Sequence, residues 1–192
     1  MRSLVLLLIA ISLSGDTPVY SRHIRRHKDC LMHMECKKGN KLIQSWEELG
    51  KGYWKWKKEL TRFFTVADEL GIKLYISKEK HFGENNQGVY NRVYNNIYLN
   101  EKIIPYPRGT VRVIRHEIWH AVQDCSVGGL YNNSDKPIFS KDELPQWSKE
   151  AAEDLYKNTS DETKHEEAEA MYVSLKRYKA VEFLEKCAEG KL

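Results

Sequence analysis

The sequence lacks any apolar run long enough to cross a bilayer. Its longest candidate, Leu4 to Ile11, reaches at most about a dozen residues with its flanks, whereas a membrane-spanning helix needs about 20. Arg2 precedes this run, and a basic start followed by a short apolar stretch is typical of a secretion signal. We therefore expect residues 1–21 to be a signal peptide, cleaved after Ser21 or Ser14. The alternative is an uncleaved N-terminal anchor.

Cysteine is scarce, and none closely follows the apolar run, which argues against a bacterial lipoprotein anchor. Cys30, Cys36, Cys125 and Cys187 form an even set in a chain expected to be secreted or periplasmic, where disulfide bonds persist. Four cysteines allow three pairings. We favour Cys30–Cys36 as a short local loop and Cys125–Cys187 as a link between two helical segments.

Internal repeats and low-complexity tracts are also absent, and the net charge of +4 is unevenly spread. Residues 22–41 carry seven Lys and Arg against two acidic residues, and 7 − 2 = +5, so this segment supplies the whole excess. No recognition module accompanies the charge, so we expect no nucleic-acid partner. The basic segment is interpreted as a solvated tail or as a pro-segment trimmed at Arg25-Arg26.

The same segment allows a second interpretation, a metal-binding tail that would suit copper. Its potential ligands are His23, His27, Cys30, His33, Met34 and Cys36. Disulfide formation would consume the thiols, which argues against this interpretation. We therefore divide the chain into a signal peptide, a basic segment over residues 22–40, and a single catalytic domain over residues 41–192.

The most informative motif is an HExxH box, in which His116, Glu117 and His120 lie within a helical pattern from Thr110 to Cys125. Thr110 is the predicted N-cap, and two glycines follow the helix. Histidines four residues apart lie on one helix face, so both can bind one metal ion. The box predicts Zn²⁺ and hydrolysis of peptide bonds by a zinc-activated water, with Glu117 as general base.

Catalytic zinc usually has three protein ligands, and the box supplies two. The metzincin pattern requires Gly and His where this chain has Gln123 and Ser126, so that class is excluded. A glutamate from a downstream helix is the other common solution. Two helical segments offer one, Glu150 to Asp154 and Glu166 to Tyr172, and the residues alone leave both open.

From Gly88 onward, the chain resembles small gluzincin-type zinc metallopeptidases of the minigluzincin kind. The resemblance rests on a hairpin at Gly88–Asn100, the HExxH helix, and a Glu-x-Glu-Ala sequence that begins at Glu167. It implies an α+β, zincin-like fold in which a small antiparallel sheet packs on the HExxH helix. A C-terminal helix then supplies the third ligand, which the family pattern places at Glu167.

One position departs from that family. Many relatives carry an Asp four residues after the ligand, and here that residue is Met171. Glu150, which does have an Asp four residues later, and Glu169 are therefore the alternative third ligands. Tyr131, Tyr156 and Tyr172 are candidates to stabilise the oxyanion. Asp124 either orients a metal ligand or is a surface residue at a helix end.

The sequence thus predicts a secreted zinc metallopeptidase that acts on a peptide or protein substrate. The competing hypothesis is a non-catalytic secreted binding protein with the same fold and a structural or vestigial metal site. Neither substrate side-chain preference nor oligomeric state follows from the residues.

The remaining segments give a coarse outline of the domain. We expect helical structure from Lys41 to Leu70, broken at Gly50 and Gly52, and a strand over Ile72 to Ser77. A helix from Trp147 to Tyr156 and a long last helix over about residues 161–189 follow.

Overall fold

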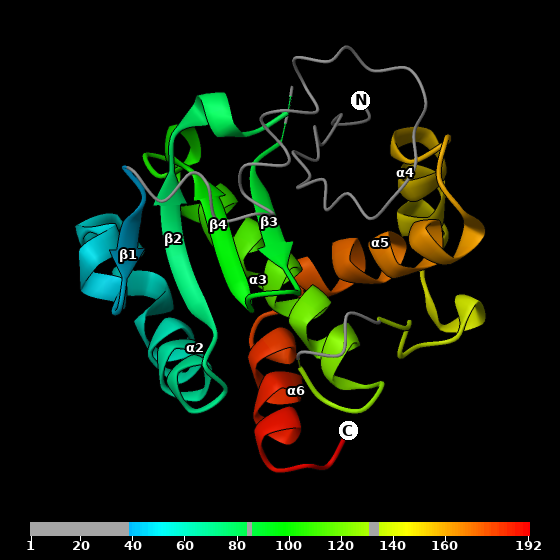
Figure 1. The fold of residues 1–192 in the computed structure, drawn as a ribbon. Coiled ribbons are helices and arrows are strands. Elements are labelled where there is room, and N and C mark those ends of the chain that lie inside the picture. Colours follow the sequence, from blue (N-terminus) through cyan, green and yellow to red (C-terminus); the bar gives the residue numbers. More distant parts are fainter. Residues whose placement is uncertain (1–38, 84–85, 131–134) are drawn as a thin grey trace.

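A four-stranded mixed sheet lies against a layer of helices in the computed structural model, which describes residues 39–83, 86–130 and 135–192 (Figure 1). The strands are β1 (Lys41–Ile43), β2 (Lys73–Ser77), β3 (Gly88–Asn91) and β4 (Asn96–Asn100). The α-helices of the described residues are α2 (Lys57–Glu69), α3 (Pro107–Cys125), α4 (Gln146–Leu155), α5 (Asp161–Ser174) and α6 (Lys179–Ala188). The expected α+β class is therefore confirmed.

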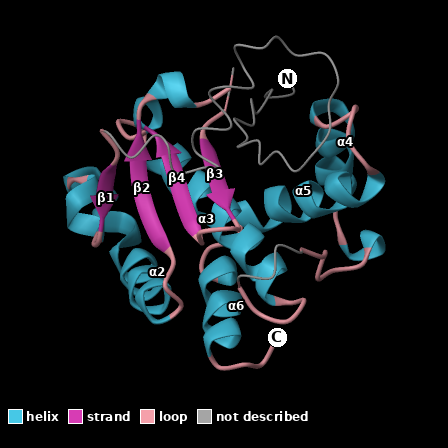
Figure 2. Ribbon diagram, viewed as in Figure 1, coloured by secondary structure: helices cyan, strands magenta, loops and turns pink. Residues whose placement is uncertain are grey.

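The strand order is β1-β2-β4-β3, as Figure 2 shows in magenta. β3 and β4 form the predicted antiparallel hairpin, with Gly88 opposite Leu99 and Asn91 opposite Asn96. β2 pairs with β4 in parallel, so the sheet is mixed, whereas the sequence suggested a purely antiparallel one. Within the described ranges β3 has only β4 as a neighbour, so it is an edge strand.

Helix α3 lies at the centre of the fold. It packs on β3 and β4 on one side and on α5 and α6 on the other. Ile114, Trp119 and Val122 are fully buried by these contacts. The helix begins at Pro107, before the predicted N-cap, because proline suits the first helical turn. The hydroxyl of Thr110 instead donates to the carbonyl oxygen of Ile103 at 2.7 Å.

The N-terminal part of the domain departs from the expected helix. Lys41–Ile43 is a strand because it pairs with β2, a contact distant in sequence that local propensity does not report. Short 3-10 turns follow, and the helix proper starts only at Lys57. Gly50 does interrupt the segment, with a φ of 113° that side chains other than glycine rarely adopt.

The predicted last helix is two helices. α5 ends at Ser174, whose carbonyl oxygen accepts a hydrogen bond from Arg115 at 3.2 Å. Tyr178 then adopts the left-handed conformation, and its backbone N–H donates to Glu59 at 3.0 Å. Glu59 also receives two hydrogen bonds from Arg115, at 2.7 and 2.8 Å. This buried ion pair joins α2, α3 and the α5–α6 turn, and breaks the helix there.

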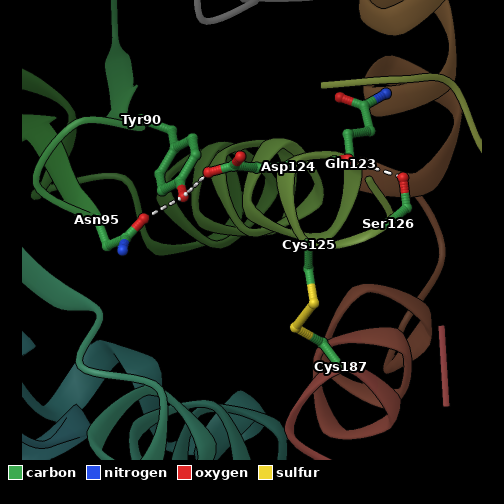
Figure 3. Close-up of a disulfide and its surroundings, with 7 residues drawn as sticks. All are labelled: Tyr90, Asn95, Gln123, Asp124, Cys125, Ser126 and Cys187. Atoms are coloured by element: carbon green, nitrogen blue, oxygen red, sulfur yellow. Dashed lines mark hydrogen bonds between the residues drawn. A yellow bond between two sulfur atoms is a disulfide. The ribbon is translucent and has the colours of Figure 1, made fainter. Parts of the chain in front are cut away.

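The disulfide bond Cys125–Cys187 is present, as favoured from the sequence (Figure 3). It joins the end of α3 to α6, so it does not bind α3 to the helix that carries Glu167. The bond is compatible with an extracellular location. The signal peptide, the basic segment up to residue 38, the Cys30–Cys36 pair and Tyr131 lie outside the described residues.

Within the described ranges, no helix combines the length and the apolar character needed to cross a membrane.

Removing the disulfide should lower stability substantially. It closes a loop between cysteines 62 residues apart, and native disulfides of this kind contribute about 2–4 kcal/mol. Replacing Cys125 and Cys187 together with alanine is expected to reduce the free energy of unfolding in urea by that amount. Reduced wild-type protein serves as the control and should approach the variant. Equal stability of oxidised wild type and variant would contradict the expectation.

Candidate metal centre

Three side chains converge where α3 and α5 cross. His116 and His120 lie one turn apart on α3, and Glu167 reaches them from α5. Glu167 Oε2 lies 3.2 Å from His116 Nε2 and 3.7 Å from His120 Nε2. The two Nε2 atoms are 3.1 Å apart. All three residues are buried, and their potential ligand atoms lie within 4.8 Å of one another, so this group could bind a metal ion.

The two alternative third ligands lie elsewhere. Glu150 is exposed on α4, where it accepts a hydrogen bond from Gln146 at 3.1 Å. Glu169 is fully buried, but its carboxylate accepts hydrogen bonds from Trp119 Nε1 and from backbone N–H groups of residues 138 and 139. Met171, four residues after Glu167, is buried in a small apolar cluster. Of the three glutamates, only Glu167 faces both histidines.

Glu117 supports the fit to a cation. It is fully buried, and no described side chain donates a hydrogen bond to its carboxylate, although the backbone N–H of Tyr90 is close enough to lower its pKa. A buried carboxylate without a side-chain donor is costly unless positive charge or water compensates it. A His₂Glu donor set beside such a carboxylate is the ligand chemistry of catalytic zinc sites. The residues present therefore fit a divalent metal ion.

Burial and neighbouring charges shift the pKa values of four ionisable side chains at this site. Burial would lower the pKa of His120, but Glu167 outweighs it and raises that pKa to about 9. Burial lowers the pKa of His116. Burial would raise the pKa of Glu167, but the adjacent histidines hold it well below its usual range. Burial raises the pKa of Glu117 to about 8.

Gln123 is a site residue that the sequence analysis missed. Its side-chain oxygen lies 2.8 Å from Nδ1 of His120, so it contacts the ring nitrogen opposite the one that faces Glu167. Gln123 lies three residues after His120, and this spacing on a helix was the signal that could have identified it.

Asp124 neither contacts a metal ligand in the described hydrogen bonds nor lies at the surface; it binds Tyr90 of the hairpin. Its Oδ2 lies 2.8 Å from the hydroxyl of Tyr90, which is also 2.7 Å from Asn95 Oδ1 (Figure 3). Asp124 therefore ties α3 to the β3–β4 hairpin and is buried, not a surface residue. Burial raises its pKa to about 6.

The two described tyrosine candidates differ in position. Tyr156 is 2% exposed, and its pKa is raised well above the usual value by burial and by its hydrogen bond to Glu167. Tyr172 packs its ring against Phe139, and Lys176 lies over it. Tyr156 therefore belongs to the site, whereas Tyr172 is half-buried and packs against the apolar cluster that contains Tyr156.

Comparison with protein-family models, with curated proteins and with solved structures found no match to this chain.

Replacing Glu167 with glutamine should abolish stoichiometric metal binding. Loss of a residue that hydrogen-bonds to a metal ligand lowers metal affinity by about 10–100-fold. Loss of a ligand itself should therefore lower the affinity by more than about 100-fold. Equilibrium dialysis against Zn²⁺ measures this directly. Glu150→Gln removes the same charge from the exposed α4 and should bind metal like wild type. If Glu167→Gln retains wild-type affinity, the ligand assignment is wrong.

Proposed function

We propose that this protein is a secreted zinc peptidase with a zincin-like active site. The observation that carries the proposal is the buried carboxylate of Glu117, which receives no hydrogen bond from a described side chain and lies close enough to His120 and Glu167 for both to shift its pKa. A carboxylate next to a three-ligand metal group is the arrangement by which metallopeptidases hydrolyse peptide bonds. A structural zinc site would normally have a fourth side-chain ligand, and the described group has three.

His116, His120 and Glu167 would hold the metal ion. When bound, zinc supplies Lewis-acid polarisation of the scissile carbonyl and lowers the pKa of the attacking water. Because two of the three ligands are neutral imidazoles and one is a carboxylate, a bound Zn²⁺ with its ligands would keep a net positive charge, which favours both effects.

Glu117 acts as the general base. Its carboxylate accepts the proton of the attacking water and then delivers that proton to the leaving amine nitrogen. Burial raises its pKa to about 8, and the positive charge of a bound cation would lower it from there. The group is therefore poised to exchange a proton near neutral pH.

Tyr156 is the best placed of the described tyrosines to stabilise the oxyanion. It lies on the α4 side of the site, at the end of that helix, and contacts Glu167. Its raised pKa keeps the hydroxyl protonated, and its single O–H, which here is hydrogen-bonded to Glu167, would turn to the carbonyl oxygen when negative charge develops there.

Strand β3 provides a binding edge for the substrate backbone. It is an edge strand beside Glu117: a Cβ atom at Gly88 would lie 2.8 Å from Glu117 Oε1 and 2.6 Å from a methyl group of Val113. The lack of a side chain at Gly88 thus lets the strand pass directly over the general base. An extended peptide pairing with this edge would present its backbone to the site.

Replacing Glu117 with glutamine should separate metal binding from catalysis. The amide cannot accept the proton, so kcat should fall by about 10²–10⁴-fold, while zinc stoichiometry stays at the wild-type value. Cleavage of a peptide library, followed by mass spectrometry, measures the first effect. Equal cleavage by wild type and variant, or no cleavage by zinc-loaded wild type, would refute the proposed activity.

Replacing Gly88 with alanine should also reduce activity. The added methyl group collides with Glu117 or displaces β3, and misplacement of a reacting group by about 1 Å can cost 10²-fold in rate. Metal affinity should change little. Gly109→Ala is the matched control, because a Cβ there meets nothing within 4 Å. Full activity in Gly88→Ala would show that this close approach is unimportant.

A further inference from the structure

A chain of hydrogen bonds leads away from the metal centre and ends at a second buried carboxylate. His120 Nδ1 lies 2.8 Å from Gln123 Oε1, and Gln123 Nε2 lies 2.6 Å from Glu169 Oε2. All three side chains are at least nine-tenths buried. In Figure 3, the side chains of Gln123 and Cys125 leave α3 on opposite sides, so this chain is separate from the disulfide.

The partners of Gln123 determine which way its amide points. The nitrogen end faces two oxygen atoms, Glu169 Oε2 and the backbone carbonyl of Glu166 at 3.0 Å, and both can only accept. The NH₂ group must therefore be at that end. The amide oxygen is left facing His120, so Nδ1 of His120 must carry a hydrogen.

This arrangement selects one tautomer of His120. With the hydrogen on Nδ1, the lone pair of the neutral ring is on Nε2, the atom that faces His116 and Glu167. A metal-ligating histidine needs such a partner on its other nitrogen to hold the ring orientation and raise its basicity. Met171, one turn after Glu167 on α5, offers no strong acceptor.

We propose that Gln123 and Glu169 are positioning residues of the metal centre. The carboxylate of Glu169 polarises the amide of Gln123, whose oxygen atom in turn orients the imidazole of His120. We call this connection the relay. The proposal rests on the proposed function only in requiring that the site binds a metal.

The carboxylate of Glu169 is fully hydrogen-bonded although it lies in the protein interior. It accepts hydrogen bonds from Trp119 Nε1 at 2.9 Å, from Gln123, and from the backbone N–H groups of Ile138 and Phe139. These four donors compensate a fully buried carboxylate. They come from α3 and from the segment before α4, while Glu169 belongs to α5. The carboxylate that holds the amide of Gln123 is therefore itself held by α3 and by the segment before α4.

The test is the zinc affinity of Gln123→Met, measured by competition with a chelator. Methionine has a similar length but cannot replace the amide as an acceptor for Nδ1–H. We expect zinc to bind about 10–100-fold more weakly. The absorption spectrum of the Co²⁺-loaded variant should also differ from that of wild type, because the orientation of His120 changes. Unchanged affinity and an unchanged spectrum would overturn the relay.

Two control variants separate positioning from general destabilisation. Gln146→Met replaces an exposed glutamine on α4 and should leave both readouts unchanged. Val66→Ala weakens the core on α2, remote in sequence from the relay, so it should lower the unfolding midpoint while zinc affinity is retained. If Val66→Ala weakens zinc binding as much as Gln123→Met, the effect is one of stability and the relay is refuted.

The part played by Glu169 is tested by a double-mutant cycle. Glu169→Gln removes the charge at constant size and should weaken zinc binding less than Gln123→Met does. Once Gln123 is replaced, Glu169→Gln should have little further effect, because the connection to His120 is already broken. Additive losses would show that Glu169 acts independently. Zinc-loaded wild type that cleaves no peptide would refute the peptidase and leave the relay standing.

Discussion

The structure depends on burying polar side chains of α3 without leaving them uncompensated. This helix lies between the sheet and two other helices, so nearly every side chain along it is enclosed. Buried polar groups require partners, and three of those on α3 find them on three different elements. Arg115 pairs with Glu59, Gln123 with Glu169, and Asp124 with Tyr90. His116 and His120, which with Glu167 could bind a metal ion, lie on the same helix as these pairs.

The same pairings place the surrounding elements. The Glu59–Arg115 pair holds α2 and the turn between α5 and α6, whereas Glu169 holds α5 itself against α3. Because Glu167 is two residues from Glu169, docking of α5 through Glu169 also brings Glu167 to the histidines. Tyr90 aligns the hairpin with the end of α3, which leaves the β3 edge beside Glu117. Structural and chemical roles are thus carried by neighbouring residues on the same elements.

The disulfide bond and the side chain of Gln123 lie on different sides of α3 (Figure 3). The disulfide joins the end of that helix to α6, while Gln123 points away from it toward α5 (Figure 3). The cross-link restricts the unfolded chain and fixes α6, but it contacts no member of the metal group. Orientation of His120 depends instead on a hydrogen-bond chain through the protein interior, where a low dielectric constant strengthens each bond.

Sequence alone determined the features that follow from local spacing. The HExxH box lies on a helix and the hairpin at 88–100 forms, because each is encoded by local periodicity. The Cys125–Cys187 pair was favoured among three possible pairings, and the packing of α6 on α3 realises it. Tertiary structure decided the rest. The resemblance favoured Glu167 but left Glu150 and Glu169 open, and it is the crossing of α5 over α3 that brings Glu167 to the histidines. The strand β1 and the break between α5 and α6 likewise arise from partners distant in the chain, which local propensity does not contain.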